Sequence, residues 1–207
     1  WWPGNFVVAV SGDISTMETL ADLDRRFREW NPGSEAVLAP RPSKPEHAVV
    51  PGVYVVDKPD VNQGRVAAGH ASAMRGDPRF PALYVMNDIL GGGGFTSRIM
   101  GRVRSDMGLA YSAGSRFEFG VWYPGDFRAA FQSKSESTVD ALGVVLEEIR
   151  RIRTEEVSDE ELRTAVSSAI GEFPQYFANA RRTAATFAND EFSGRDPLFW
   201  KTYRERM

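Results

Sequence analysis

The 207-residue chain contains no cysteine, so it has no disulfide, no thiolate ligand for a metal and no cysteine nucleophile. It also lacks the run of roughly 18 apolar residues that a membrane span requires, and no signal peptide is recognisable. Its formal net charge is −3, whereas nucleic-acid-binding modules carry a strong basic excess. We therefore expect no nucleic-acid partner and no membrane span.

Histidine is scarce, with His47 and His70 the two in the chain. Neither has a second histidine roughly three to five residues away, which is the spacing typical of compact zinc sites. His47 lies beside a proline-rich stretch, and His70 lies within an expected strand. We interpret both as ordinary polar residues and expect no metal-binding residue in this chain.

The composition that remains is that of a globular protein. Hydrophobic residues make up 42% of the chain and charged residues 26%, and this length buries a substantial core. The chain begins at Trp1 rather than at methionine, and its last residues still have helical character. We interpret residues 1–207 as one zinc-free domain, an excised and C-terminally truncated fragment of a larger protein. The sequence does not assign that protein to a cellular compartment. For a bacterial parent we expect a soluble, cytoplasmic protein.

The order of elements predicts the fold class. Apolar or alternating runs predict strands at residues 6–10, 53–56, 64–72, 109–119 and 125–132. Helical spacing predicts helices after the capping boxes at Ser15 and Ser158, and also from Asp77, over 96–107, from Val139 and over 175–189. Strands that follow one another without a crossover favour hairpins. The sequence thus predicts an α+β, two-layer architecture, with a mostly antiparallel mixed sheet and helices packed on one face.

One stretch is more specific than the rest of the chain. Residues 90–99 read LGGGGFTSRI, and residues 104–112 read RSDMGLAYS. The glycine run lacks the G-K-[ST] ending of a phosphate-binding loop and follows a helix rather than a strand. Gly108 is placed to end its helix in the left-handed conformation and to turn the following strand back across the helix end.

These motifs resemble the non-catalytic, C-terminal type of domain of the pitrilysin/insulinase family of zinc peptidases, which includes the mitochondrial processing peptidase. The junction at residues 5–13, the helix start at Ser158 and the segment 194–196 fit the same pattern. The catalytic domains of that family carry an inverted zinc motif, H-x-x-E-H, and this sequence has no such string. The resemblance therefore places zinc on a partner domain, with no cofactor in this chain.

The resemblance also implies roles for particular residues. In this family the zinc-free domain donates an arginine and a tyrosine to the active site, and the matching positions are Arg104 and Tyr111. The tyrosine would donate a hydrogen bond to the carbonyl oxygen as charge develops, and the arginine would hold a main-chain carbonyl. The glycine-rich loop, with Gly92, Gly93, Gly94 and Phe95, would contact substrate.

Each of these residues also has an ordinary structural explanation. Arg104 lies where a cation stabilises the last turn of a helix. Tyr111 fits a half-buried strand tyrosine, and the glycines fit a tight turn between two helices.

Two functions follow from the resemblance. The first is a substrate-binding domain that completes the active site of an H-x-x-E-H partner, in the same chain or on another subunit, and acts on peptides. The alternative is a catalytically inert structural or assembly domain of the same fold, and a free-standing peptide carrier that adds a strand is a lesser possibility. Without its partner, the fragment is expected to form a homodimer or to self-associate, because a surface that the partner covers is then exposed.

Overall fold

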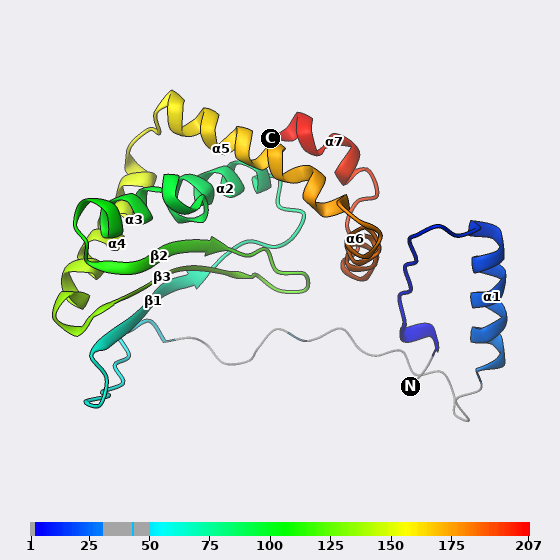
Figure 1. Ribbon diagram of the computed structural model, residues 1–207, viewed down its shortest axis with the longest axis horizontal. Coiled ribbons are helices and arrows are strands. Elements are labelled where there is room, and N and C mark those ends of the chain that lie inside the picture. The colour runs from blue at the N-terminus through cyan, green and yellow to red at the C-terminus, as the bar shows by residue number, and fades with distance from the viewer. Residues whose placement is uncertain (1–2, 31–42, 44–49) are drawn as a thin grey trace. The chain divides into compact units, whose positions relative to one another are not determined.

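The computed structural model describes residues 3–30, 43 and 50–207 (Figure 1). The contacts within the chain divide it into two compact units. The larger unit consists of residues 43–171 and 204–207, and the smaller of residues 1–42 and 172–203. No helix in the described ranges has both the length and the apolar character needed to cross a membrane.

The larger unit contains a three-stranded sheet with the order β1-β3-β2. Its strands are β1 (Gln63–Ala71), β2 (Ala110–Phe117) and β3 (Asp126–Lys134). Both pairings are antiparallel, and one parallel bridge outside the strands joins Met74 to Gly120. The predicted strands at 64–72, 109–119 and 125–132 are confirmed to within two residues or so at their ends. The fold is therefore the α+β arrangement that the element order predicts.

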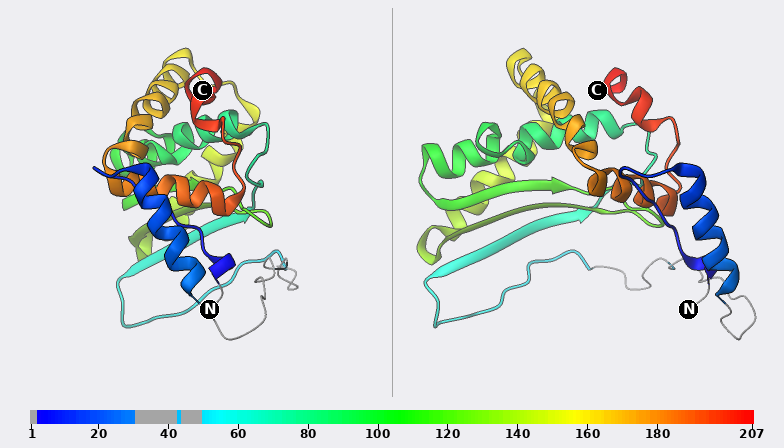
Figure 2. Two further views of the ribbon diagram at one scale, coloured as in Figure 1. Left: turned by 90° about the vertical axis from the view of Figure 1, so that its right-hand side faces the viewer. Right: turned by 45° about the vertical axis from the view of Figure 1, so that its right-hand side comes forward.

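Helices cover one face of this sheet (Figures 1 and 2). The long helices of the unit are α2 (Phe80–Asn87), α4 (Thr138–Thr154) and α5 (Asp159–Glu172). The short helical segments are η2 (Asp88–Gly92), η3 (Gly94–Thr96), α3 (Arg98–Met100), η4 (Gly101–Asp106) and η5 (Ser135–Ser137). The single helix predicted over 96–107 is wrong in detail, because the chain there passes through a 3-10 turn, one α-turn and a π-helical segment.

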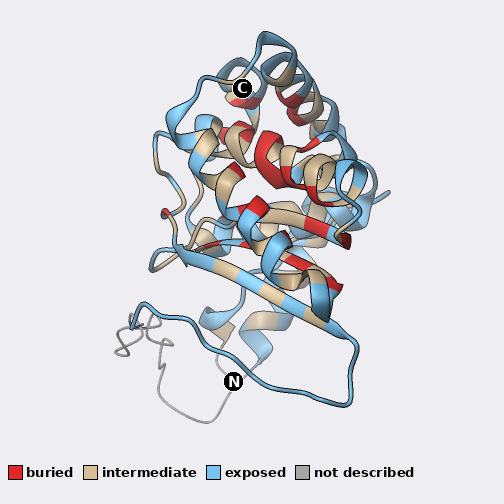
Figure 3. Cartoon of the chain, turned by 90° about the vertical axis from the view of Figure 1, so that its left-hand side faces the viewer, coloured by how far each residue is buried: buried red, intermediate tan, exposed pale blue. Residues whose placement is uncertain are grey.

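The core lies between the sheet and these helices (Figure 3). Alternate residues of β3 point into it, with Phe127, Ala129 and Phe131 all buried. Across from them lie Leu90, Ile99, Val103, Ala141 and Val145. Burying each of the larger aliphatic side chains contributes roughly 1.5–3 kcal/mol. The intervening residues of the strands point to the opposite face, which no helix of this unit covers.

Helix α5 forms a second tier on the helical layer. Its Ala165 packs with Val85 of α2 and Ile89 of η2 in a smaller apolar cluster. The predicted capping box at its start is confirmed. The Glu161 amide donates to Ser158 Oγ at 3.2 Å, and the Ser158 amide donates to Glu161 Oε2 at 2.9 Å.

The regular elements among the described residues of the smaller unit are all helical. It holds η1 (Pro3–Asn5), α1 (Thr16–Glu29), η6 (Phe173–Phe177), α6 (Ala180–Ser193) and α7 (Phe199–Arg206). Ser15 caps α1 as predicted, since its side chain accepts the Glu18 amide. The helix predicted over 175–189 is interrupted, because Asn179 takes an extended conformation and caps α6. Phe173, Trp200 and Tyr203 stack in an aromatic cluster.

Two strand predictions are wrong. Residues 6–10 and 53–56 form no strand, although both are apolar and suited to extended structure. A strand needs a neighbour to accept and donate its backbone hydrogen bonds, and neither segment has one among the described residues. Val53, Tyr54, Val55 and Val56 are instead 76–90% exposed. Most of the proline-rich stretch at residues 31–51 lies outside the described residues, as does His47.

Candidate functional site

The glycine run makes a tight turn against the sheet. Gly91 is buried on β2, where an added Cβ would lie 2.4 Å from the Ser115 amide nitrogen. Gly94 has a φ of 62°, in the left-handed region that favours glycine. The run therefore joins η2 to η3 in a conformation that other residues would strain. Gly92 and Gly94 remain exposed at its surface.

The turn presents Phe95 to solvent. The Ser97 amide and hydroxyl both donate to the Gly94 carbonyl, at 3.1 and 2.6 Å. Thr96 Oγ1 donates to the Gly93 carbonyl at 2.9 Å. These bonds fix the backbone on both sides of Phe95, whose side chain is nevertheless 70% exposed. An aromatic ring held in this position contributes little to the core.

Gly108 reverses the chain between η4 and β2. It has a φ of 61°, as the sequence predicts, and its amide donates to the Arg104 carbonyl at 3.1 Å. The Leu109 amide then donates to the Val103 carbonyl at 2.9 Å. Val103 is fully buried, so η4 is anchored in the core next to Arg104. The reversal brings the start of β2 back beside the end of η4.

Tyr111 lies at a bulge in β2. The pairing register with β3 shifts between Ala110 and Ser112, which leaves Tyr111 without an opposite residue. Its side chain is 82% exposed. The alternative that Tyr111 is a half-buried core residue is therefore wrong.

The side chains of Phe95, Arg104 and Tyr111 meet. Arg104 Cζ lies 4.8 Å from the centre of the Phe95 ring and 5.5 Å from the centre of the Tyr111 ring. Both distances are within the range of cation–π attraction. Within the described residues, the Arg104 guanidinium forms no ion pair. The rings contact the guanidinium group and leave its N–H donors free of acidic partners. The structure thus joins three of the six residues expected at the site, and the three glycines directly precede Phe95.

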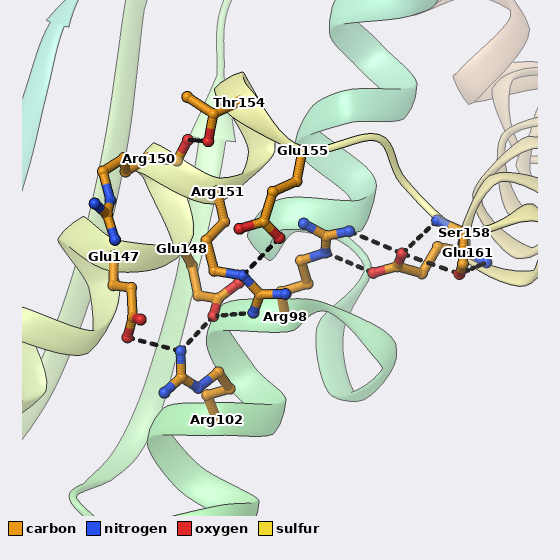
Figure 4. A network of polar contacts seen from close by, with 10 residues as sticks. All are labelled: Arg98, Arg102, Glu147, Glu148, Arg150, Arg151, Thr154, Glu155, Ser158 and Glu161. Carbon is orange, nitrogen blue, oxygen red and sulfur yellow. Dashed lines mark hydrogen bonds and ion pairs between the residues drawn. The ribbon is translucent and has the colours of Figure 1, made fainter.

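A network of ion pairs lies on the other side of the same segment (Figure 4). Glu148 of α4 is fully buried, and its Oε1 accepts from Arg102 at 2.7 Å and from Arg151 at 3.0 Å. Arg102 also donates to Glu147 at 2.8 Å. The neighbouring carboxylates raise the pKa of both arginines. Because a buried charge is costly without a partner, these pairs hold η4 on α4.

A second part of the network fastens α3 to α5. Arg98 donates to both oxygens of Glu161, at 2.5 and 2.8 Å. This bidentate pair, together with two bonds from Ser158, lowers the pKa of Glu161 to about 2. In the sequence, Arg98 stands only within the motif at residues 90–99 and Glu161 only within the capping box at Ser158, and nothing marks Glu148. The i, i+4 spacing of Arg98 and Arg102 is the one sequence signal that both lie on the same side of their helical segment.

A polar cavity of about 340 Å³ opens beside this network. Its lining includes Phe95, Arg98, Arg102, Asp106 and Glu148. Positive and negative side chains are balanced there, so the cavity shows no preference for a charged ligand. It belongs to the ion-pair network more than to the exposed Phe95–Arg104–Tyr111 cluster.

Comparison with known families identifies the chain. The model of the peptidase M16 inactive domain matches residues 2–168, which is most of the sequence. The chain belongs to the peptidase M16 family. The match confirms the resemblance to the zinc-free domains of pitrilysin-type peptidases.

A curated relative of this M16 domain is an uncharacterized zinc protease of Streptomyces coelicolor. The two are 27% identical over 173 residues, which is 82% of this chain and 37% of the relative. The chain therefore spans little more than a third of the length of the relative that it matches.

Solved structures share the fold of this M16 domain. A protease from Helicobacter pylori superposes with a TM-score of 0.77 at 18% identity, over 95% of this chain and 47% of its own. The periplasmic protease PqqL from Escherichia coli gives 0.73 at 18% identity, over 94% and 21%. A peptidase M16 inactive domain from Pseudomonas fluorescens gives 0.64 at 24% identity, over 70% and 34%.

The residues of this M16 domain do not fit a zinc ion. The H-x-x-E-H string is absent from the sequence. In the ranges that the structure describes, no three histidine or acidic side chains are grouped as a metal would require. The described part of this chain therefore offers no set of ligands for the zinc ion of an M16 peptidase.

Proposed function

We propose that this chain is the substrate-binding, zinc-free domain of a zinc metalloendopeptidase. In this proposal it completes the active site of an H-x-x-E-H domain, which lies in the same polypeptide or on another subunit. Arg104 and Tyr111 are its catalytic residues. The backbone of Gly92, Gly93 and Gly94 and the ring of Phe95 contact the peptide.

The observation that carries the proposal is the arrangement of Arg104 between two exposed aromatic rings. Cations at protein surfaces are normally solvated or paired with a carboxylate, and Arg104 has no ion pair among the described residues. Phe95 and Tyr111 are too exposed to serve the core. Three side chains from η3, η4 and β2 thus converge at a surface where they stabilise little, which favours a role in binding.

The geometry suits a peptide backbone. The guanidinium presents planar N–H donors, which match the carbonyl oxygens of an extended chain. The Tyr111 hydroxyl forms no hydrogen bond to the described part of the chain, so it is free to donate to substrate. When negative charge develops on the scissile carbonyl oxygen, a hydrogen bond from the phenol to that oxygen becomes stronger. Arg104 would set the register of the peptide, and Tyr111 would stabilise the transition state.

The relatives support peptidase activity for the full-length protein that contains this chain. The Streptomyces coelicolor relative is named a zinc protease, and two of the solved structures that share the fold are proteases. Because this chain lacks the zinc motif, the attacking water must come from the partner domain. Pairing of the two domains accounts for both facts.

The test is made in the full-length protein that carries this chain together with its zinc-bearing domain. Tyr111→Phe removes one hydroxyl and keeps the ring, so turnover should fall by roughly 10²–10³ with little change in KM. Arg104→Lys keeps the charge and loses the planar donor group, so it should raise KM as well as lower kcat. Steady-state kinetics on a quenched peptide measures both, and thermal unfolding checks that the variants fold.

The inert structural domain predicts a different pattern. In that case both variants would keep wild-type turnover per folded molecule, and any loss would appear only in the melting temperature. Such a result would overturn the catalytic assignment of Arg104 and Tyr111. The isolated chain serves as the control, since it should retain no zinc after dialysis and cleave no peptide.

A further inference from the structure

The sheet has one face that the helices of its unit leave open (Figure 3). We call it the open sheet face. It consists of the alternate residues of β1 from Gln63 to Ala71 and of β3 from Asp126 to Lys134, together with Ser112, Gly114 and Arg116 of β2. The pairing register places these residues side by side on one face of the sheet. The residues that alternate with them along β3 point to the other face and belong to the core.

The open sheet face is basic in an acidic chain. It carries Arg65, Arg116, Arg128 and Lys134, and its one acidic residue is Asp126. The whole chain has a net charge of −3. Positive charge is therefore concentrated on a surface where the composition alone predicts none.

Two of these arginines have no acidic partner in the part of the chain that the structure describes. Arg116 pairs with Glu118 at 3.0 Å and more distantly with Asp126 at 3.9 Å. Arg65 and Arg128, in contrast, form no ion pair within the described residues. Arg128 also lies directly opposite Arg116 in the register, and like charges in that position repel each other. The positive charge of the face is thus available to a binding partner.

The middle of the face lets a polypeptide approach closely. Ala67, Ala130 and Gly114 lie in one row across the three strands, so no side chain there extends beyond a methyl group. The neighbouring row on one side holds Arg65, and the row on the other side holds Arg116 and Arg128. An extended segment lying along the small residues would have arginine side chains on both flanks.

The face is continuous with the Phe95–Arg104–Tyr111 cluster. Ser112 follows Tyr111 directly and lies opposite Gln132, which in turn lies opposite Arg65. A peptide held at Tyr111 therefore reaches the first row of the open sheet face within one residue of β2.

We propose that the open sheet face binds an acidic, extended segment of the peptide substrate, next to the part that Arg104 and Tyr111 hold. This inference rests on the proposed function and adds a substrate preference to it. The positive rows attract carboxylate side chains, and the planar guanidinium groups of Arg65 and Arg128 pair with them.

The test compares two quenched peptides in the full-length protein. The peptides share the cleaved sequence and differ in a flanking segment that is rich in glutamate in one and in serine and glycine in the other. The double variant Arg65→Glu, Arg128→Glu should raise KM for the acidic peptide by about tenfold at low salt and leave kcat unchanged. For the neutral peptide KM should change by less than about twofold.

A control reverses the charge of one arginine on the helical side, which is half the charge change of the double variant. Arg153 is exposed on α4, and Arg153→Glu should leave both peptides within about twofold of wild type. Equal loss in Arg153→Glu and in the double variant, or equal loss of the two peptides, would overturn the proposal. So would wild-type KM for the acidic peptide in the double variant.

The two proposals fail in distinguishable ways. If Tyr111→Phe keeps normal turnover while the double variant still loses the acidic peptide, the catalytic assignment is wrong and the binding face stands. If Tyr111→Phe loses turnover and the double variant treats both peptides alike, the acidic preference is wrong. Should the glutamate variants unfold, the double variant Arg65→Gln, Arg128→Gln removes the two positive charges without adding negative ones. It should raise KM for the acidic peptide by about threefold.

Discussion

Gly91 is the residue at which the fold demands the absence of a side chain. Its Cβ position lies 2.4 Å from the Ser115 nitrogen and 2.9 Å from the Gly114 carbonyl carbon, and both are backbone atoms that cannot rotate away. Packing against β2 therefore explains why glycine is required at the start of the run, whether or not the loop binds a ligand. Gly94 adds a second reason, because its left-handed φ turns the chain toward Phe95.

Replacing Gly91 by alanine should lower the free energy of unfolding by about 1–3 kcal/mol, because β2 or η2 must shift. Gly101→Ala is the matched control. Gly101 is helical, with a φ of −55°, and an added Cβ there meets no atom within 4 Å. It should gain roughly 0.5–1 kcal/mol through helix propensity. Urea unfolding of both variants measures the difference, and equal stability would contradict this account of the turn.

At the scale of elements, the Glu161 carboxylate both caps the start of α5 and connects α5 to another helix. Glu161 accepts the backbone and side chain of Ser158 at the helix start, and it also binds Arg98 of α3. Because α3 leads into η4, the same contact stabilises the segment that carries Arg104. The capping residue that the sequence predicts at the start of α5 thus also forms a tertiary contact with α3.

Glu161→Gln should cost about 2 kcal/mol of stability at pH 7. Arg98 holds the pKa of Glu161 near 2 in the folded chain, below the ordinary value of 4.5. The stabilisation is therefore complete above about pH 5 and is lost as the pH falls through about 2, below which both states bind the proton. Denaturation at several pH values should show wild type and variant converging in acid.

Glu160→Gln is the control for this prediction. Glu160 is an exposed neighbour on the same helix with no ion pair in the described part of the chain, and its substitution should change stability by less than about 0.5 kcal/mol at every pH. A full-sized gap between Glu161→Gln and wild type that persists below pH 2 would rule out ionisation of Glu161 as the cause.

At the scale of the molecule, an exposed apolar run precedes a strand that forms one edge of the sheet. β1 pairs only with β3 among the described residues, and Val53–Val56 just before it are almost fully exposed. Exposed strand edges and apolar patches both promote association.

We expect the isolated chain to self-associate, and Val55→Lys to weaken this association because it places a charge within the apolar run. Met17→Lys places the same charge on α1, at a methionine that is 79% exposed, and should have a smaller effect. Light scattering over a range of concentrations measures both. A monomer at high concentration would show that these surfaces do not attract each other.

The sequence by itself determines the local features of this protein. The N-cap at Ser15, the capping box at Ser158, the turn at Gly108 and the hairpin of β2 and β3 depend on residues close together in the chain, and all are found as predicted. The motifs around residues 90–112 also identify the family. Such features follow from the chemistry of a few neighbouring residues, so a linear pattern is enough to recognise them.

Only the tertiary structure decides which distant groups meet. Residues 6–10 and 53–56 have the composition of strands, yet they are not strands, because pairing depends on a partner that composition does not supply. Glu148 is unremarkable in the sequence and becomes a fully buried acceptor of two arginines. The stacking of Arg104 on Phe95 and Tyr111, and the basic row on the open sheet face, likewise depend on chain reversal and strand register. These are long-range contacts, and their geometry is fixed only when the whole domain packs.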